Sequence, residues 1–184
     1  MKSDSRHQRA ADYVDTLAQR GRYYFTVEQL QEALGVSAPA ARNALKRLAA
    51  RNRVASPGRG FYVVIPPEYR TLGCLPAEQF IPALMERAGK PYYVGLLSAA
   101  QYYGAAHHRP QEFQVFLEKN RRPIACGAVR VAFIARKRLN QVPTRSFNSP
   151  RGALKVSTPE ATAIDLVGYP GHAGGLDQVA TVIA

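Results

Sequence analysis

Residues 26–64 read TVEQLQEALGVSAPAARNALKRLAARNRVASPGRGFYVV, and this stretch decides the fold of the N-terminal part. Thr26 is a good helix N-cap, and Gln29, three residues later, completes a capping box. Apolar residues then recur at helical spacing as far as Leu34, and Gly35 suits the left-handed position that ends a helix. We therefore expect a first helix that starts at Val27 and a tight turn after it.

A second helix is expected from residue 38 to about residue 51. Ser37 is its predicted cap, and Pro39 lies in the first turn, where a missing backbone N–H is tolerated. An apolar stripe should pack inward; it consists of Ala41, Ala44, Leu45 and Leu48. The opposite face carries Pro39, Asn43 and Lys46, flanked by Arg42 and Arg47.

Two short β-prone runs follow, at residues 53–55 and 60–65, joined by Ser56-Pro57-Gly58-Arg59. A helix is also expected at residues 6–20, ending at Gly21, and a short strand at residues 23–25, whose aromatic side chains should pack in the core. This order of helices and hairpin predicts a winged helix-turn-helix.

The second helix is the predicted recognition helix. An α-helix fits the major groove of DNA, and Arg, Lys and Asn side chains can form paired hydrogen bonds with guanine or adenine edges. The predicted DNA-binding residues are Ser37, Pro39, Arg42, Asn43, Lys46, Arg47 and Arg59, with Ser37 on a phosphate and Arg59 near the backbone or minor groove. A solvated basic surface is the plainer interpretation, and some winged helices bind protein instead.

The composition indicates two small domains and a polyanionic partner. The chain has 184 residues, 46% of them hydrophobic, a formal charge of +12 and a pI near 10.1. There are 12 basic and 6 acidic residues up to Arg70, and 13 and 7 after it, so both parts are equally basic. Cys74 and Cys126 show no pairing pattern, and no membrane span or signal peptide is apparent, which predicts a reduced cytoplasmic setting.

We expect a winged helix domain at residues 1–65, a proline-rich linker at 66–75 and a mixed α/β domain at 76–184, hence the α+β class. In the last domain, helices are expected at 77–87 and 94–103 and strands at 112–117, 124–126, 129–134 and 154–156. Thr158 and Pro159 then open a helix that runs through Val167, with Glu160 near its positive end. The apolar run at 176–184 stops without a cap, which favours a longer natural chain.

Enzymatic and metal sites are not expected. His107-His108 has no third ligand at a recognisable spacing, and Glu160 and Asp165 lie on different faces of one helix. Residues 112–119 form an expected strand with acids at both ends, as in a metal-dependent nuclease, but no nearby aspartate completes a magnesium site. We therefore predict no catalytic residue, cofactor or metal. A second basic surface at Arg121, Arg122, Arg136, Lys137 and Arg138 is either a solvated rim or a contact surface for nucleic acid.

Three further stretches are distinctive: YYVGLLSAA at 92–100, Arg122-Pro123-Ile124, and VSTPEATAIDL at 156–166. With these and the winged helix, the chain resembles the AbiEi family of antitoxins from type IV abortive-infection toxin–antitoxin systems, which act in phage defence. The resemblance implies a bacterial cytoplasmic repressor that binds inverted repeats in its own promoter, as a monomer or as a dimer formed on DNA. It also implies antagonism of a nucleotidyltransferase-like toxin, with or without a stable complex. The alternatives are a winged-helix-targeted nuclease and a ligand-responsive regulator, whose pocket the sequence does not reveal.

Overall fold

The computed structural model describes residues 2–105 and 110–183, which form two compact units. The first unit contains the chain up to Phe80 together with Ile124–Val129, and the second contains the described residues of 81–123 and 130–184. Helices make up 46% of the residues and strands 24%, so the expected α+β class is confirmed. The division at a linker over 66–75 stays a prediction; this segment contains a short 3-10 helix, η1 (Pro67–Tyr69).

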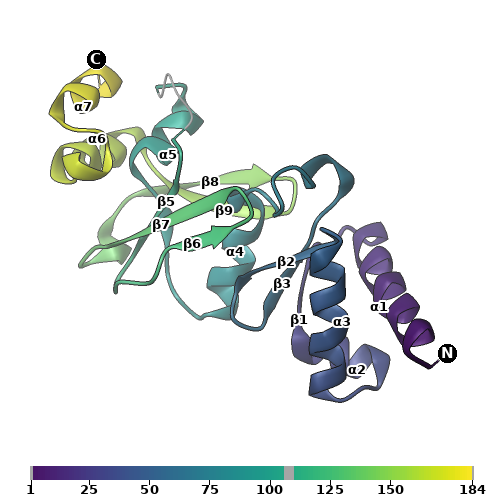
Figure 1. Ribbon diagram of the computed structural model, residues 1–184. Helices are drawn as coiled ribbons and strands as arrows, with labels where there is room; N and C mark the ends of the chain where they lie inside the picture. The colour runs from purple at the N-terminus through teal and green to yellow at the C-terminus, as the bar shows by residue number, and fades with distance from the viewer. Residues whose placement is uncertain (1, 106–109, 184) are drawn as a thin grey trace. The chain divides into compact units, whose positions relative to one another are not determined.

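Three helices and a small antiparallel sheet build most of the first unit (Figure 1). The helices are α1 (Lys2–Gln19), α2 (Val27–Leu34) and α3 (Ala38–Ala50), and the strands are β1 (Tyr24–Thr26), β2 (Val54–Gly58) and β3 (Phe61–Val64), in the order β1-β3-β2. The unit also contains β6 (Ile124–Cys126). The predicted winged helix-turn-helix is thereby confirmed.

Local signals account for the ends of α2. The Thr26 hydroxyl accepts a hydrogen bond from the Gln29 backbone N–H at 3.2 Å, and the Gln29 side chain accepts one from the Thr26 N–H at 3.0 Å. These bonds satisfy two of the amides that a helix start leaves free. Gly35 ends the helix with φ +60°, as expected. Ser37 holds the N-cap position of α3, but its side chain makes no capping hydrogen bond.

The core of the first unit confirms the predicted inward stripe of α3. Ala41, Ala44, Leu45 and Leu48 are all buried, and they belong to the same apolar cluster as Phe25 of β1. The Phe25 ring meets Tyr13 edge to face at 5.6 Å and stacks on Tyr62 at 5.7 Å between centroids. The aromatic run at residues 23–25 therefore packs in the core as expected.

The wing differs from the predicted hairpin in its turn. Strand β2 continues through Pro57, which is buried, to Gly58, and its register with β3 shifts between Ala55 and Gly58. Proline has no N–H to donate to a strand ladder. It is therefore tolerated within a strand at an irregularity of this kind, where no ladder hydrogen bond from that residue is needed. The tip is therefore Arg59 followed by Gly60, whose φ of +67° suits glycine.

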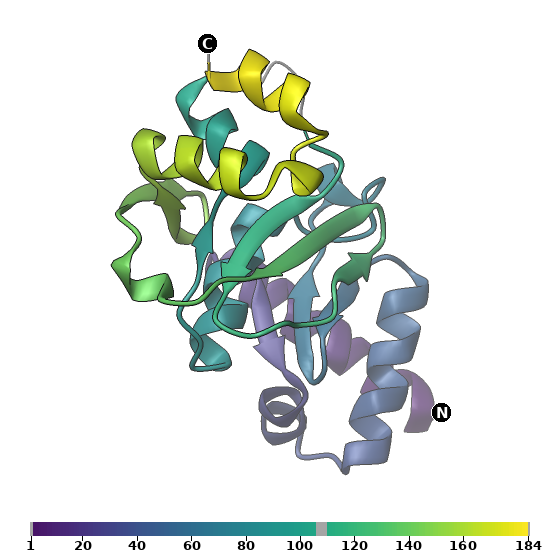
Figure 2. The ribbon, with the colours of Figure 1, turned by 90° about the vertical axis from the view of Figure 1, so that its left-hand side faces the viewer.

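In the second unit, five strands of the larger sheet have the order β7-β5-β4-β9-β8. They are β4 (Tyr93–Val94), β5 (Phe113–Leu117), β7 (Val129–Ala135), β8 (Thr144–Ser149) and β9 (Gly152–Ser157). The helical segments are α5 (Leu96–Ala100), η2 (Gln101–Tyr103), η3 (Leu139–Gln141), α6 (Pro159–Gly168), η4 (Pro170–His172) and α7 (Leu176–Ile183). Helix α4 (Ala77–Arg87) has the predicted bounds. Figures 1 and 2 show α5, α6 and α7 grouped on one side of this sheet.

The predicted helix over 94–103 is wrong at its start. Val94 is a strand residue that pairs with both Val115 and Val156, so the backbone there belongs to the sheet. Gly95 separates strand from helix, and a Cβ on it would lie 2.5 Å from the Phe116 ring. Only the shorter α5 and the 3-10 helix η2 follow.

Strands β4 and β8 were not predicted. Strand β8 is polar, and most of its side chains are exposed, so it has no apolar alternation for a pattern to detect. It forms because all six of its residues pair with β9 across an antiparallel ladder. Pairing across the sheet, and not local preference, decides this element.

Helix α6 begins as predicted. Thr158 is the N-cap, and its hydroxyl accepts a hydrogen bond from the Ala161 N–H at 3.3 Å. The Glu160 carboxylate accepts hydrogen bonds from the Glu160 backbone N–H and from the Thr158 hydroxyl. These bonds lower the pKa of Glu160, which agrees with a capping role. Leu166 points into a core shared with Tyr93, Phe116 and Ile134.

Candidate nucleic-acid interface

The outward face of α3 presents every polar group expected there. All seven predicted DNA-binding residues are exposed: Ser37, Pro39, Arg42, Asn43, Lys46, Arg47 and Arg59. Within residues 2–105 and 110–183, none of these side chains makes an ion pair or a side-chain hydrogen bond. The inward packing of Leu45 and Leu48 fixes which face of the helix remains outside. The cationic groups are therefore available to a ligand.

The chain segment that forms α3 and the wing is basic and contains no acid of its own. No acidic residue occurs between Glu32 and Glu68, a stretch that contains all of α3 and the wing. Arg53, at the base of the wing, forms an ion pair with Asp15 of α1. Several exposed cations on one helix face create a positive potential, which attracts a polyanion and speeds its association.

The start of α3 adds a second kind of anion contact. The Ser37 hydroxyl is exposed and makes no capping bond, and Pro39 is exposed in the first turn. The first amides of a helix have no partner within the helix, and the helix dipole is positive at this end. This end can accept a phosphate oxygen through backbone N–H groups.

The second predicted basic surface divides into bound and solvated groups. Arg122, Lys137 and Arg138 are exposed, as expected. Arg121 lies over the Phe133 ring at 5.0 Å, with Met85 Sδ 4.0 Å from its guanidinium, and burial lowers its pKa. Arg136 is also turned into the protein, so two of the five cations contribute to packing.

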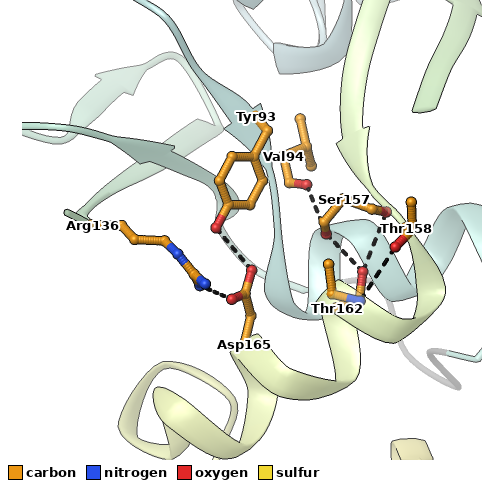
Figure 3. A network of polar contacts seen from close by, with 8 residues as sticks. Tyr93, Val94, Arg136, Ser157, Thr158, Thr162 and Asp165 are labelled. Atoms are coloured by element: carbon orange, nitrogen blue, oxygen red, sulfur yellow. Dashed lines mark hydrogen bonds and ion pairs between the residues drawn. The ribbon is translucent and has the colours of Figure 1, made fainter. Parts of the chain in front are cut away.

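Arg136 forms an ion pair with Asp165, a residue of α6 whose side chain is fully buried (Figure 3). The Tyr93 hydroxyl donates a hydrogen bond to the other oxygen of this carboxylate at 2.9 Å. Burial raises the pKa of Tyr93, which keeps its hydroxyl protonated and able to donate. The carboxylate is thus satisfied on both oxygens, and it fixes the orientation of the Arg136 guanidinium.

A neutral network lies beside this ion pair. Ser157 and Thr162 share a hydrogen bond of 2.7 Å between their hydroxyls, and the Val94 carbonyl is 3.4 Å from the Ser157 oxygen (Figure 3). The Tyr103 hydroxyl donates to the Ser157 carbonyl at 2.7 Å. These bonds tie α6 to β4 and β9. Ser157 and Thr162 are five residues apart, whereas Val94 and Tyr103 lie 63 and 54 residues before Ser157, so no local pattern indicates the contacts between these stretches.

The two cysteines, which show no pairing pattern in the sequence, are neighbours in the structure. Both are buried free thiols, and a hydrogen bond joins Cys74 to Cys126. That bond, followed by burial, raises the pKa of Cys74, so the thiol stays protonated. The chain segments meet closely here: the Ala128 N–H donates to the Leu72 carbonyl at 2.7 Å.

His107 and His108 lie outside the described residues. Among the residues that the structure describes, no group of three or more His, Cys, Asp or Glu side chains is arranged to hold a metal ion. No helix in the described part of the chain is long and apolar enough to cross a membrane.

Comparison with known proteins gives two family matches. Residues 12–65 match the model described as "Transcriptional regulator, AbiEi antitoxin", and residues 93–184 match "AbiEi antitoxin C-terminal domain". No curated protein matches the chain. The crystal structure of the RV2827C protein from Mycobacterium tuberculosis matches with a TM-score of 0.62 at 19% identity and covers 90% of this chain. The match spans 62% of that protein, and at this identity the likeness shows the fold.

Proposed function

Because the chain belongs to the AbiEi antitoxin family, we propose that it represses its own operon and acts as the antitoxin of a type IV toxin–antitoxin pair. In this proposal α3 enters the major groove of an inverted repeat in the promoter. The toxin is a nucleotidyltransferase-like protein encoded next to the antitoxin. The protein works in the cytoplasm, and it counteracts the toxin with or without a stable complex between the two.

The observation that carries the DNA-binding part is the exposed and unpaired face of α3. Arg42, Asn43 and Lys46 can reach base edges, because paired hydrogen bonds from such side chains distinguish guanine and adenine. Ser37 and the free amides near it hold a phosphate, and Arg59 at the wing tip contacts the backbone or minor groove. Two copies on an inverted repeat match the symmetry of the DNA.

A mobility-shift titration with promoter DNA tests the repressor role. We expect the chain to prefer the inverted repeat over a scrambled duplex, and Arg42→Ala to lose about 1–3 kcal/mol of that preference because one base contact disappears. Arg20→Ala is the matched control, since it removes an equal charge from an exposed residue after α1. Equal losses in the two variants would contradict the recognition-helix assignment.

Co-expression with the neighbouring gene tests the antitoxin role separately. We expect the chain to restore growth to cells that make the toxin. Arg42→Ala should still restore growth when both genes are expressed from a foreign promoter, because repression is then not needed. A variant that lost rescue together with DNA binding would show that one surface serves both roles.

A further inference from the structure

The second unit contains a pocket that the proposed function does not use. Its volume is about 350 Å³, and it lies between the segment after β7 and one side of α6. Its lining residues are Arg136, Lys137, Arg138, Gln141, Val142, Pro143, Ala161 and Ile164. Pockets that hold small molecules generally measure about 300–1,000 Å³, so this one is large enough for a compact ligand.

One side of the pocket is strongly basic. Three consecutive cations line it, none of the lining residues is acidic, and Lys137 and Arg138 make no ion pair within the described ranges. The Asp165 carboxylate binds one amino group of Arg136. A guanidinium has five N–H donors in a fixed fork, so Arg136 keeps donors for a ligand while Asp165 holds it in place.

Arg138 adds a sign of local strain. Its backbone has φ 55° and ψ 43°, the left-handed region in which an arginine is unusual. Such a conformation is maintained by its surroundings, and residues with a strained backbone are often found at ligand-binding sites. Here it places Lys137 and Arg138 beside one another at the pocket, directly before η3.

The rest of the lining is largely apolar. Ile164 of α6 is 66% exposed, which is high for an isoleucine, and Ala161, Val142 and Pro143 also line the pocket. An inorganic ion alone would leave the apolar lining residues exposed to water. A ligand with a charged end and a flat or apolar body would contact both the basic and the apolar lining residues.

We propose that this pocket binds a small organic phosphate with the chemistry of a nucleoside monophosphate. The phosphate lies among Arg136, Lys137 and Arg138, and the base or another ring covers Ile164 and Pro143. Phosphate is favoured over a single carboxylate because a phosphomonoester carries about −1.5 to −2 charges at pH 7, which matches the two cations that remain after Arg136 pairs with Asp165. None of its lining residues belongs to the α3 face.

Calorimetric titration of the full chain with adenosine 5′-monophosphate tests the proposal. We expect saturable binding, while adenosine and inorganic phosphate each bind at least about tenfold more weakly, since each lacks one of the two contacts. Lys137→Gln should weaken binding about tenfold by removing a charge-assisted contact. Arg122→Gln is the matched control: it removes an exposed charge outside the pocket and should change binding less than twofold.

Two further variants, one of them with a matched control, test whether a loss of binding comes from the pocket itself or from loss of the folded structure. Arg138→Gly should weaken binding without lowering the melting temperature, because glycine adopts φ 55° freely. Ile164→Ser should weaken binding, whereas Val167→Ser, at an equally exposed position of α6 outside the pocket, should not. The proposal is overturned if the nucleotide does not bind saturably, or if Lys137→Gln and Arg122→Gln have equal effects. It is also overturned if nonspecific duplex DNA displaces the nucleotide, because the pocket would then belong to a DNA surface.

Discussion

On α3, Arg42, Lys46 and Arg47 point into solvent without ion pairs among the described residues, whereas after β7 Arg136 reaches back to a buried aspartate. The two parts of the chain carry the same formal charge, so composition alone does not distinguish them. The difference lies in the partner of each cation. A guanidinium held by a buried carboxylate contributes to the fold and has a fixed orientation, whereas one left in solvent can move to meet a polyanion.

The largest effect is expected from Asp165→Asn, which keeps the shape of the side chain and removes its charge. Arg136, whose side chain is 23% exposed, would then lack its counter-charge. We expect the free energy of unfolding to fall by about 3 kcal/mol, near the lower end for a broken buried pair because some solvent reaches Arg136. Urea denaturation measures the change in the free energy of unfolding. An unchanged midpoint would mean that this ion pair adds no stability.

Lys46→Ala should impair DNA binding and leave the stability of the fold almost unchanged, the opposite of Asp165→Asn. We expect operator discrimination to fall by about 1–3 kcal/mol if Lys46 contacts a base, while the free energy of unfolding changes by less than about 0.5 kcal/mol because the residue is exposed. Binding titrations and urea denaturation on the same samples measure both quantities. A large loss of stability would remove the distinction between the two clusters.

Arg59→Ala should act mainly on the salt dependence of DNA binding. A lost phosphate contact lowers the slope of log affinity against log salt by about 1 and weakens operator and scrambled DNA equally. Titrations at several salt concentrations measure the slope. If discrimination changed instead, Arg59 would read bases and the wing would need a new role.

The smallest effect is expected from Asp15→Asn, the exposed counterpart of Asp165→Asn. Its ion pair with Arg53 has side-chain exposures of 53% and 27%, so solvent already screens it. Such pairs contribute about 0–1 kcal/mol to the free energy of unfolding. The same denaturation experiment applies, and a loss comparable with that of Asp165→Asn would show that burial does not set the difference.

Much of the first unit was readable from sequence because its signals are local. The capping box of Thr26 and Gln29, the turn at Gly35 and the apolar stripe of α3 each depend on residues no more than four positions from the next one, and the structure confirms all three. The exposed face of α3 followed from the same periodicity. The role of that face in DNA binding stays a proposal.

The second unit was predicted less well because its decisive contacts are distant in sequence. Strand β8 has no apolar pattern and exists through its pairing with β9. Val94 pairs with strands on both sides and therefore belongs to the sheet, although the apolar pattern after it predicts a helix that starts at this residue. The predicted wing turn at residues 56–59 starts too early, because β2 continues through Pro57 to Gly58 at a strand irregularity.

The sequence by itself determined where the helices of the winged domain begin and end, which face of α3 is apolar, and how much charge each part carries, because caps and helical periodicity act over a few residues. Only the tertiary structure decided how those charges are used. It brought Asp165 to Arg136 and Tyr93, placed Cys74 beside Cys126, and joined three cations to an apolar wall of α6. These contacts link positions far apart in the chain, so they depend on how the strands and helices pack.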